Sequence, residues 1–234
     1  MSTADPGEET PQEPEFPDDV NLAWHCVLEN NPTRFAQFFE NEEDPYKEKA
    51  LEHLNQRNDE GKSPLDLSST LGRLDMTKEL ITRGGEVNSS SCQGYIPLHR
   101  AAAWGRIDVL KLLVDNGADL QQKTVHGERA REVALRYNHA ECVDYLDWAE
   151  AKVFLQDTIR AMQETLADPE KIQGRLTKDD RNICMNACKE KSDWVDLTVD
   201  ATTQDFILKK QELDEIFAPI WVKLSEPRKF HTST

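Results

Sequence analysis

The middle of the chain alternates short apolar helical runs with glycine-containing turns. Between Gly94 and Gly117, Pro97 presets the backbone for the first turn of a helix, and the small residues 101–103 let that helix approach its neighbours closely. Gly105 and Gly117 supply the permissive backbone on which a helix ends. The pattern therefore predicts a turn, a helix, a tight loop, a second helix and a second turn.

The same pattern recurs at a spacing of 33 residues. An earlier copy contains Gly61, Pro64, Leu65, Gly72, Asp75 and Gly84, and a weaker later copy contains Gly127, Ala134, Asn138 and Leu146. In the later copy Ala130 and Arg131 replace the Pro-Leu pair, as expected of a terminal repeat. These residues and their spacing resemble the ankyrin repeat, which implies a stack of helix pairs that binds proteins through turn tips and inner helices.

The segment before the first clear copy is expected to close the stack. Residues 22–39 fit two short helices broken at Asn30-Asn31-Pro32, and residues 46–54 fit a further helix in an insertion. We interpret this segment as a degenerate opening repeat.

After the third copy the pattern predicts three longer helices. The first covers residues 149–166, the second begins after Thr177 as its N-cap, and the third covers about residues 204–224. The apolar positions that carry this pattern are Val153, Leu155, Ile159, Met162, Leu166, Ile183, Cys184, Ala187, Cys188, Trp194, Phe206, Leu213, Ile216, Phe217, Ile220 and Leu224. Three such helices form a small bundle.

The bundle carries a second resemblance, over residues 171–224. The order and spacing of Gly174, Asp179, Trp194 and Phe206, and of the run from Glu212 to Ile220, are similar to the helical lid of the seventy-kilodalton heat-shock chaperones. The nucleotide-binding and substrate-binding domains of those chaperones have no counterpart here, so the resemblance implies no ATP-driven activity.

The predicted fold class is all-α, a short ankyrin-repeat solenoid followed by a small helical bundle. The predicted domains are a disordered acidic tail at 1–19, the repeats at 20–148, the bundle at 149–224 and a disordered tail at 225–234. Residues 1–19 hold four prolines, seven carboxylates and no basic residue, a composition typical of disorder.

Charge and cysteine usage narrow the function classes. The net charge is −16, of which −12 falls in residues 1–60, where 16 acidic side chains face 4 basic ones. An acidic chain without a basic stripe disfavours nucleic acid and anionic membrane as partners, and no apolar run is long enough to predict a membrane span. Five cysteines scattered along the chain favour a reduced, intracellular protein. We expect it in the cytoplasm, and association with the cytoskeleton is the alternative.

No motif for catalysis is present, so we expect no enzyme activity, cofactor, metal or small-molecule substrate. Cys184 and Cys188 share a helix face without a second ligand pair, which favours buried structural residues over a zinc site. His99 fits the ankyrin pattern, which implies a structural ring that bonds neighbouring turns.

The candidate partner-binding residues are large side chains at equivalent repeat positions. Leu71, Trp104 and Tyr137 lie 33 residues apart, just before the residue that ends each inner helix. They form either an exposed binding stripe or ordinary packing between repeats. Arg100, Tyr95 and Arg136 are expected on the same surface, and the turn tips at 58–62, 91–95 and 123–127 are further candidates. In the bundle we expect Trp221 in the core and Phe230 exposed.

The predicted function is a non-catalytic protein-binding adaptor. Two alternatives remain at this point: a structural scaffold in a cytoskeletal or cell-division assembly, and chaperone-linked client binding through the lid-like bundle. Charge complementarity adds the hypothesis that the acidic tail masks the groove by folding onto Arg100, Arg106 and Arg136.

Overall fold

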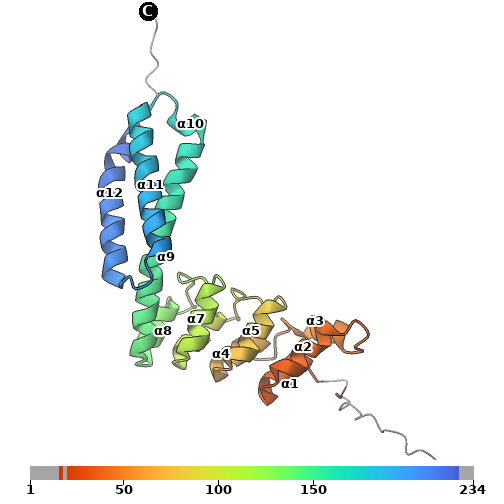
Figure 1. The fold of residues 1–234 in the computed structure, drawn as a ribbon. Coiled ribbons are helices and arrows are strands. Elements are labelled where there is room, and N and C mark those ends of the chain that lie inside the picture. Colours follow the sequence, from red (N-terminus) through yellow and green to blue (C-terminus); the bar gives the residue numbers. More distant parts are fainter. Residues whose placement is uncertain (1–15, 18–19, 227–234) are drawn as a thin grey trace, which may run out of the picture. The chain divides into compact units, whose positions relative to one another are not determined.

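The computed structural model describes residues 16–17 and 20–226, and all regular secondary structure within these ranges is helical (Figure 1). The chain divides into two compact units between Arg129 and Ala130. The all-α class expected from the sequence is confirmed. Among the described helices, none has both the length and the apolar composition needed to cross a bilayer.

The first unit consists of helix pairs in two layers. Its helices are α1 (Leu22–Glu29), α2 (Pro32–Glu40), α3 (Lys47–His53), α4 (Pro64–Leu71), α5 (Leu74–Thr82), α6 (Pro97–Ala103) and α7 (Ile107–Asp115). Helix α4 packs between α1 and α6, and α5 packs between α2 and α7. The expected break at residues 30–32 and the expected insertion helix are both observed.

The helix ends follow from the residues at them. Proline occupies the first turn of α2, α4 and α6, where its missing N–H costs no hydrogen bond. Helix α1 ends on Asn30 and helix α4 ends on Gly72, both with left-handed backbone, at φ 54° and 74°. Asn138, the counterpart of these residues in the third copy, has φ 60°. A residue with positive φ therefore stands at the C-cap of α1 and α4, and within two residues after the last residue of α6 and α8, where Gly105 has φ 62° and Asn138 has φ 60°.

Arginine side chains link successive pairs at these same helix ends. Arg73 Nη1 donates to the carbonyl of Val27 in α1, and Arg106 Nε donates to the carbonyl of Thr70 in α4 at 3.1 Å. The last carbonyls of a helix lack intrahelical partners and carry partial negative charge. Each cation thus stabilises the end of the helix in the preceding pair.

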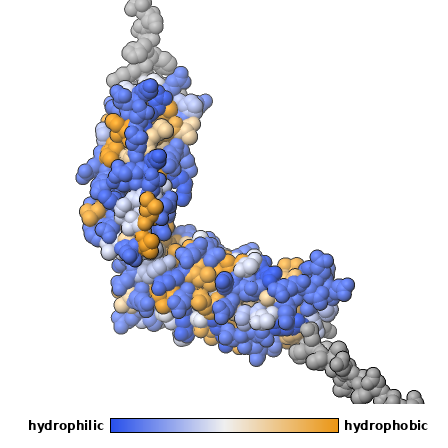
Figure 2. All heavy atoms as spheres, in the orientation of Figure 1, coloured by the Kyte–Doolittle hydropathy of each residue, from blue (hydrophilic) through white to orange (hydrophobic). Residues whose placement is uncertain are grey.

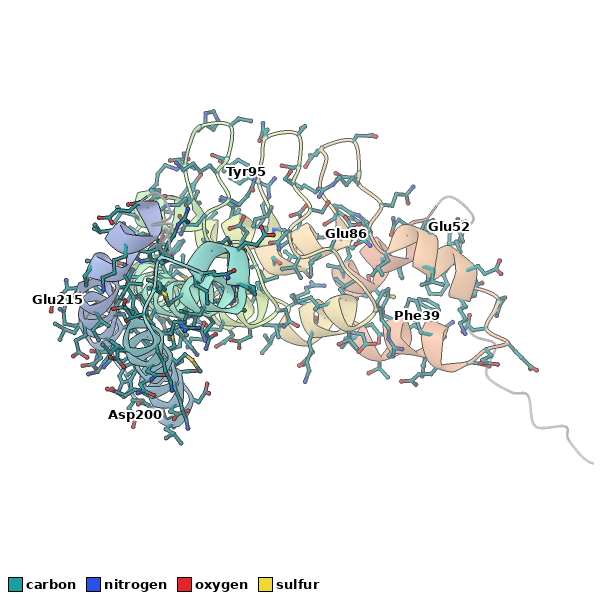
Figure 3. The ribbon with its side chains drawn as sticks, turned by 90° about the horizontal axis from the view of Figure 1, so that it is seen from above. Phe39, Glu52, Glu86, Tyr95, Asp200 and Glu215 are labelled. Carbon is teal, nitrogen blue, oxygen red and sulfur yellow. The ribbon has the colours of Figure 1, made fainter. Side chains whose placement is uncertain are left out.

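The three turn tips of the first unit share one hydrogen-bond pattern. Ser91 N–H donates to the carbonyl of Tyr95 at 2.9 Å and Gly94 N–H donates to Ser91 at 2.8 Å, and the equivalent bonds occur at residues 58–62 and 124–128. The Val125 N–H also donates to the carbonyl of Gln93 at 3.0 Å, which ties neighbouring tips together. Figure 3 shows the tips projecting from the helices on one side, with Tyr95 near the base of one of them.

The second unit contains α8 (Ala130–Arg136), α9 (Ala140–Ala167), α10 (Pro169–Ile172), α11 (Lys178–Leu197) and α12 (Thr203–Ser225). Helix α9 runs without interruption through residues 148 and 149, where the sequence suggested a domain boundary. Neither glycine nor proline occurs between Ala140 and Ala167, so nothing in the sequence ends the helix there. The second helix of the third copy and the first bundle helix are one element.

Helices α9, α11 and α12 lie side by side around the core of the second unit (Figure 1). The buried residues are Leu155, Ile159, Met162, Ile172, Leu176, Cys184, Ala187, Cys188, Val195, Ala201, Phe206, Leu213, Phe217 and Ile220. Trp221, which was expected in this core, is exposed instead, and so are Val153 and Ile183 of the apolar helix pattern. Each lies one or two positions from a buried residue, and a step of one residue turns the side chain about 100° around the helix.

The terminal segments expected to be disordered lie almost wholly outside the described residues. Phe16 and Pro17 are described, and Ser225 is the last residue of α12. The expected exposure of Phe230 also falls outside the described part of the chain.

Candidate protein-interaction surface

Two of the candidate binding residues lie at the ends of neighbouring inner helices in the first unit. Leu71 is the last residue of α4, and Trp104 is the C-cap of α6, which packs against α4. Their side chains are 38% and 57% exposed. Large exposed apolar side chains at adjacent helix ends are typical of a protein-interaction surface.

Arg100 and Tyr95 adjoin Trp104. Arg100 precedes Trp104 by four residues on α6, a spacing that places both on one helix face. The Arg100 guanidinium carbon lies 4.7 Å from the centroid of the Tyr95 ring, a cation–π contact that holds the side chain in place. Within the described residues Arg100 Nε has no hydrogen-bond partner. This Nε is buried, and the cation–π pair of Arg100 and Tyr95 lies in the same repeat as the exposed Trp104.

The positive charge of Arg100 acts on carboxylates of the preceding repeat. The pKa of Glu60 is lowered, mainly by its hydrogen bond to Lys62, and Arg100 adds to that effect. Burial raises the pKa of Asp66, while hydrogen bonding by Ser63 and the charges of Arg57 and Arg100 oppose this. The surface therefore combines cationic and aromatic groups with a nearby carboxylate.

His99 is structural, as the sequence pattern implied. The ring is fully buried, Nδ1 accepts from the Ile96 N–H at 3.2 Å, and Nε2 lies 3.2 Å from the carbonyl of Glu128. Since Nδ1 accepts, we assign the proton to Nε2, which donates to the next turn. Burial lowers the pKa of His99, so the ring stays neutral.

Arg136 and Tyr137 belong to the second unit, where they end α8. Both are exposed, Tyr137 by 53%, and the Arg136 guanidinium carbon lies 5.1 Å from the centroid of the Tyr137 ring. The pair repeats the cation–π chemistry of Arg100 and Tyr95. A continuous stripe formed by Leu71, Trp104 and Tyr137 stays a prediction.

The two bundle cysteines are buried, as expected. Burial raises the pKa of Cys188 to about 11 and also raises that of Cys184, so both thiols stay protonated and unreactive. The described residues contain no group of three or more potential ligands that could hold a metal ion.

A hollow in the second unit was not predicted from the sequence. It has a volume of about 430 Å³ between α9 and α11, with Leu166, Met185 and Cys188 among its apolar lining residues and Lys189 and Asp193 among its polar ones. In the sequence, the apolar Met185 on a largely polar helix is the feature that indicates this hollow.

A second feature that the sequence analysis missed is Phe16. It lies within the segment expected to be disordered, yet its ring contacts the rings of His25, Phe38 and Tyr46. An isolated apolar residue in an acidic, proline-rich segment was the available signal.

The stacked helix pairs and repeated turn tips define a helical-repeat protein. A family model described as ankyrin repeats, in three copies, matches residues 24–124. The chain belongs to the ankyrin-repeat family. It is 37% identical over 216 residues to ankyrin repeat domain-containing protein 45 of Homo sapiens, a match that covers 92% of this chain and 81% of that protein.

Two further relatives carry the same name. The Mus musculus protein is 36% identical over 225 residues, covering 96% of this chain and 91% of the relative. The Danio rerio protein is 50% identical over 99 residues, covering 42% of this chain and 44% of the relative, so that match spans less than half of its length. The similarity to the human and mouse proteins extends through the second unit. The likeness of residues 171–224 to the chaperone lid stays a prediction.

Ankyrin repeats indicate protein–protein interaction, and ankyrin-repeat proteins are in general non-catalytic binding proteins. Membership of the family therefore indicates that the repeats bind a protein partner. It identifies neither that partner nor the residues that bind it.

Proposed function

We propose that the chain is a cytoplasmic, non-catalytic adaptor that binds a protein partner through the first unit. The binding site comprises Leu71, Tyr95, Arg100 and Trp104. The observation that carries this proposal is Trp104, 57% exposed one turn after an arginine that is stacked on a tyrosine. We call these four residues the inner-helix site.

The chemistry of the inner-helix site fits a partner with an apolar residue beside a carboxylate. Trp104 and Leu71 supply apolar area, and Arg100 supplies a preorganised donor, since its contact with Tyr95 reduces the side-chain entropy lost on binding. Tryptophan, tyrosine and arginine are the residue types most enriched at binding hot spots. We propose the cation–π pair of Arg136 and Tyr137 in the second unit as a partner contact in its own right.

The test is proximity labelling in cells that express the wild type or variants of matched stability. The Leu71→Ala, Trp104→Ala double variant is expected to lose a defined set of neighbouring proteins, and adding Tyr137→Ala extends the loss. Leu51→Ala is the control, because Leu51 is 51% exposed on α3, away from the site. Neighbours that persist in the double variant would contradict the proposal.

A second candidate function is client binding by the second unit, supported by the hollow between α9 and α11. Figure 2 shows hydrophobic side chains among hydrophilic ones on the visible face of this unit. Met185→Lys places a charge in the apolar lining and is expected to weaken suppression of client aggregation by the full chain. Equal suppression by wild type and variant, or none by either, removes this candidate.

A further inference from the structure

The first unit holds an aromatic socket that one residue of the N-terminal segment occupies. The Phe16 ring lies edge-on to His25 of α1, Phe38 of α2 and Tyr46, with ring centroids 5.2, 5.8 and 5.2 Å away. We call His25, Phe38 and Tyr46 the opening socket. Edge-to-face contacts of this kind add to the stabilisation that comes from burial alone.

A hydrogen bond and a cation–π contact also hold Phe16 in the opening socket. The Phe16 N–H donates to the Tyr46 hydroxyl at 3.3 Å, and the Arg34 guanidinium carbon lies 5.8 Å from the centroid of the Phe16 ring. Arg34 is held over Phe38, 4.5 Å from its ring centroid, and pairs with Asp44 at 3.5 Å. The opening socket therefore fits a phenyl ring together with a backbone N–H that donates one hydrogen bond.

The net charge of the N-terminal segment disfavours the binding of Phe16 in the opening socket. Residues 1–19 carry a net charge of −7, and residues 20–60 carry nine acidic and four basic side chains, net −5. In α1, α2, α3 and the loop between α2 and α3, exposed carboxylates outnumber the half-buried cations. The exposed carboxylates are Glu29, Glu40, Glu42, Glu43, Glu48 and Glu52, and the half-buried cations are Arg34, Lys47 and Lys49. The N-terminal segment and the part of the chain that forms the opening socket therefore carry net charges of the same sign.

We propose that the opening socket is a second partner-binding site, which accepts an aromatic residue flanked by lysine or arginine. Phe16 is a tethered competitor for it. Tethering supplies a local concentration in the millimolar range, which keeps Phe16 seated despite the repulsion. Basic flanks reverse the sign of the electrostatic interaction, so such a partner segment displaces Phe16.

The test uses the full chain and three synthetic peptides of equal length. One has Phe-Pro at its centre with lysines on both sides, the second replaces the phenylalanine by alanine, and the third replaces the lysines by glutamates. Fluorescence anisotropy measures their binding to the wild type and to Phe16→Ala, which empties the opening socket. Thermal unfolding establishes that the variant is folded.

We expect the lysine-flanked Phe peptide to bind Phe16→Ala at least tenfold more tightly than the wild type. It should also bind at least tenfold more tightly than the alanine peptide of equal charge and than the glutamate-flanked peptide. Equal binding of the Phe and Ala peptides would reduce the interaction to non-specific charge attraction and overturn the proposal. Absence of binding to the emptied socket would overturn it as well.

A second variant keeps Phe16 and changes only the charge beside it. Glu13→Lys with Glu15→Lys makes the tethered competitor more complementary, so the lysine-flanked Phe peptide is expected to bind this variant more weakly than the wild type. Unchanged or tighter binding would contradict the competition. Because the inner-helix site is intact in both variants, these results are independent of the first proposed function.

Discussion

Single side chains join the repeats of the first unit across the gaps between helix pairs. His99 donates to the carbonyl of Glu128 in the next tip, and Arg106 donates to the carbonyl of Thr70 in the preceding pair. Asn88 accepts from the Asp119 N–H at 2.8 Å and donates to the Gly117 carbonyl at 2.9 Å. Asn55 makes the equivalent bonds one repeat earlier. The stability of the contacts between repeats therefore depends on the protonation state and geometry of a few side chains.

The buried ring of His99 predicts that stability depends on pH. Burial lowers the pKa of His99 in the folded state, so the unfolded chain binds more protons at mildly acidic pH. Stability is therefore greatest above the unfolded pKa of about 6.5 and falls as pH decreases through and below that value. Urea unfolding of the wild type at pH 8 and pH 5.5 measures this loss.

His99→Gln is the matched variant. It should be destabilised at pH 8 by about 1–3 kcal/mol through weakened hydrogen bonds. Its stability should nevertheless fall less between pH 8 and 5.5, because glutamine does not titrate. His53, whose pKa burial also lowers, contributes to both proteins alike. Identical pH dependence in the two proteins would show that His99 is not the group responsible.

At the scale of elements, helix ends decide where each helix stops and what it contacts. Thr177 and Thr202 form capping boxes with Asp180 and Asp205 at the starts of α11 and α12. Lys223 near the end of α12 also donates to Asp180 at 2.7 Å, and mainly this bond lowers the pKa of Asp180. Ends of different helices are thereby stabilised by one another.

Gly72 predicts the cost of changing one helix end. A Cβ at this position would lie 2.7 Å from Cδ of Arg106, whereas a Cβ at Gly117 would have no atom within 4 Å. Both glycines have positive φ, 74° and 79°, so Gly117→Ala should lose about 1–2 kcal/mol from backbone strain alone. Gly72→Ala should lose more, because the Arg106 side chain must also move.

Urea unfolding of the two glycine variants and of the double variant Gly72→Ala, Arg106→Ala tests this explanation. In the background of Arg106→Ala, the additional cost of Gly72→Ala should disappear. If Gly72→Ala and Gly117→Ala are equally destabilised, the contact with Arg106 has no energetic weight.

At the scale of the whole molecule, the two units have separate hydrophobic cores. Phe35 is fully buried in the first and Phe217 in the second. Replacing either by alanine should cost about 3–5 kcal/mol. We expect Phe217→Ala to lower amide-exchange protection in α9, α11 and α12 while α4 to α7 keep theirs, and Phe35→Ala to do the reverse. Hydrogen exchange with mass spectrometry measures both, and loss throughout the chain in either variant would indicate one cooperative unit.

The repeat period accounts for most of what could be predicted about the fold. Proline and glycine spaced at 33 residues act locally, through φ and helix ends, so the bounds of α4 and α6 follow from the sequence. The candidate site was predicted less completely. Exposure of Trp104 was one of two open alternatives, because a repeat position shared by large apolar residues fits packing and binding equally.

Core assignments in the second unit were less reliable for a physical reason. An apolar residue at the edge of the buried helix face fits the helical periodicity as well as an apolar residue at its centre. The packing of the neighbouring helices decides which of the two is buried. Trp221 and Val153 are exposed for that reason. The packing of Phe16 depends on Phe38 and Tyr46, which lie more than twenty residues from it in sequence, so no local pattern predicts it.

By itself, the sequence determined the helical-repeat class, the opening helices, the turn tips and the capped start of α11 at Thr177, because each depends on residues within a few positions of one another. Only the tertiary structure decided that α9 continues from the third repeat into the bundle and which apolar side chains stay exposed. Only the tertiary structure shows that the Phe16 ring packs against His25, Phe38 and Tyr46. These features depend on contacts between distant segments, whose free energy no local residue pattern contains.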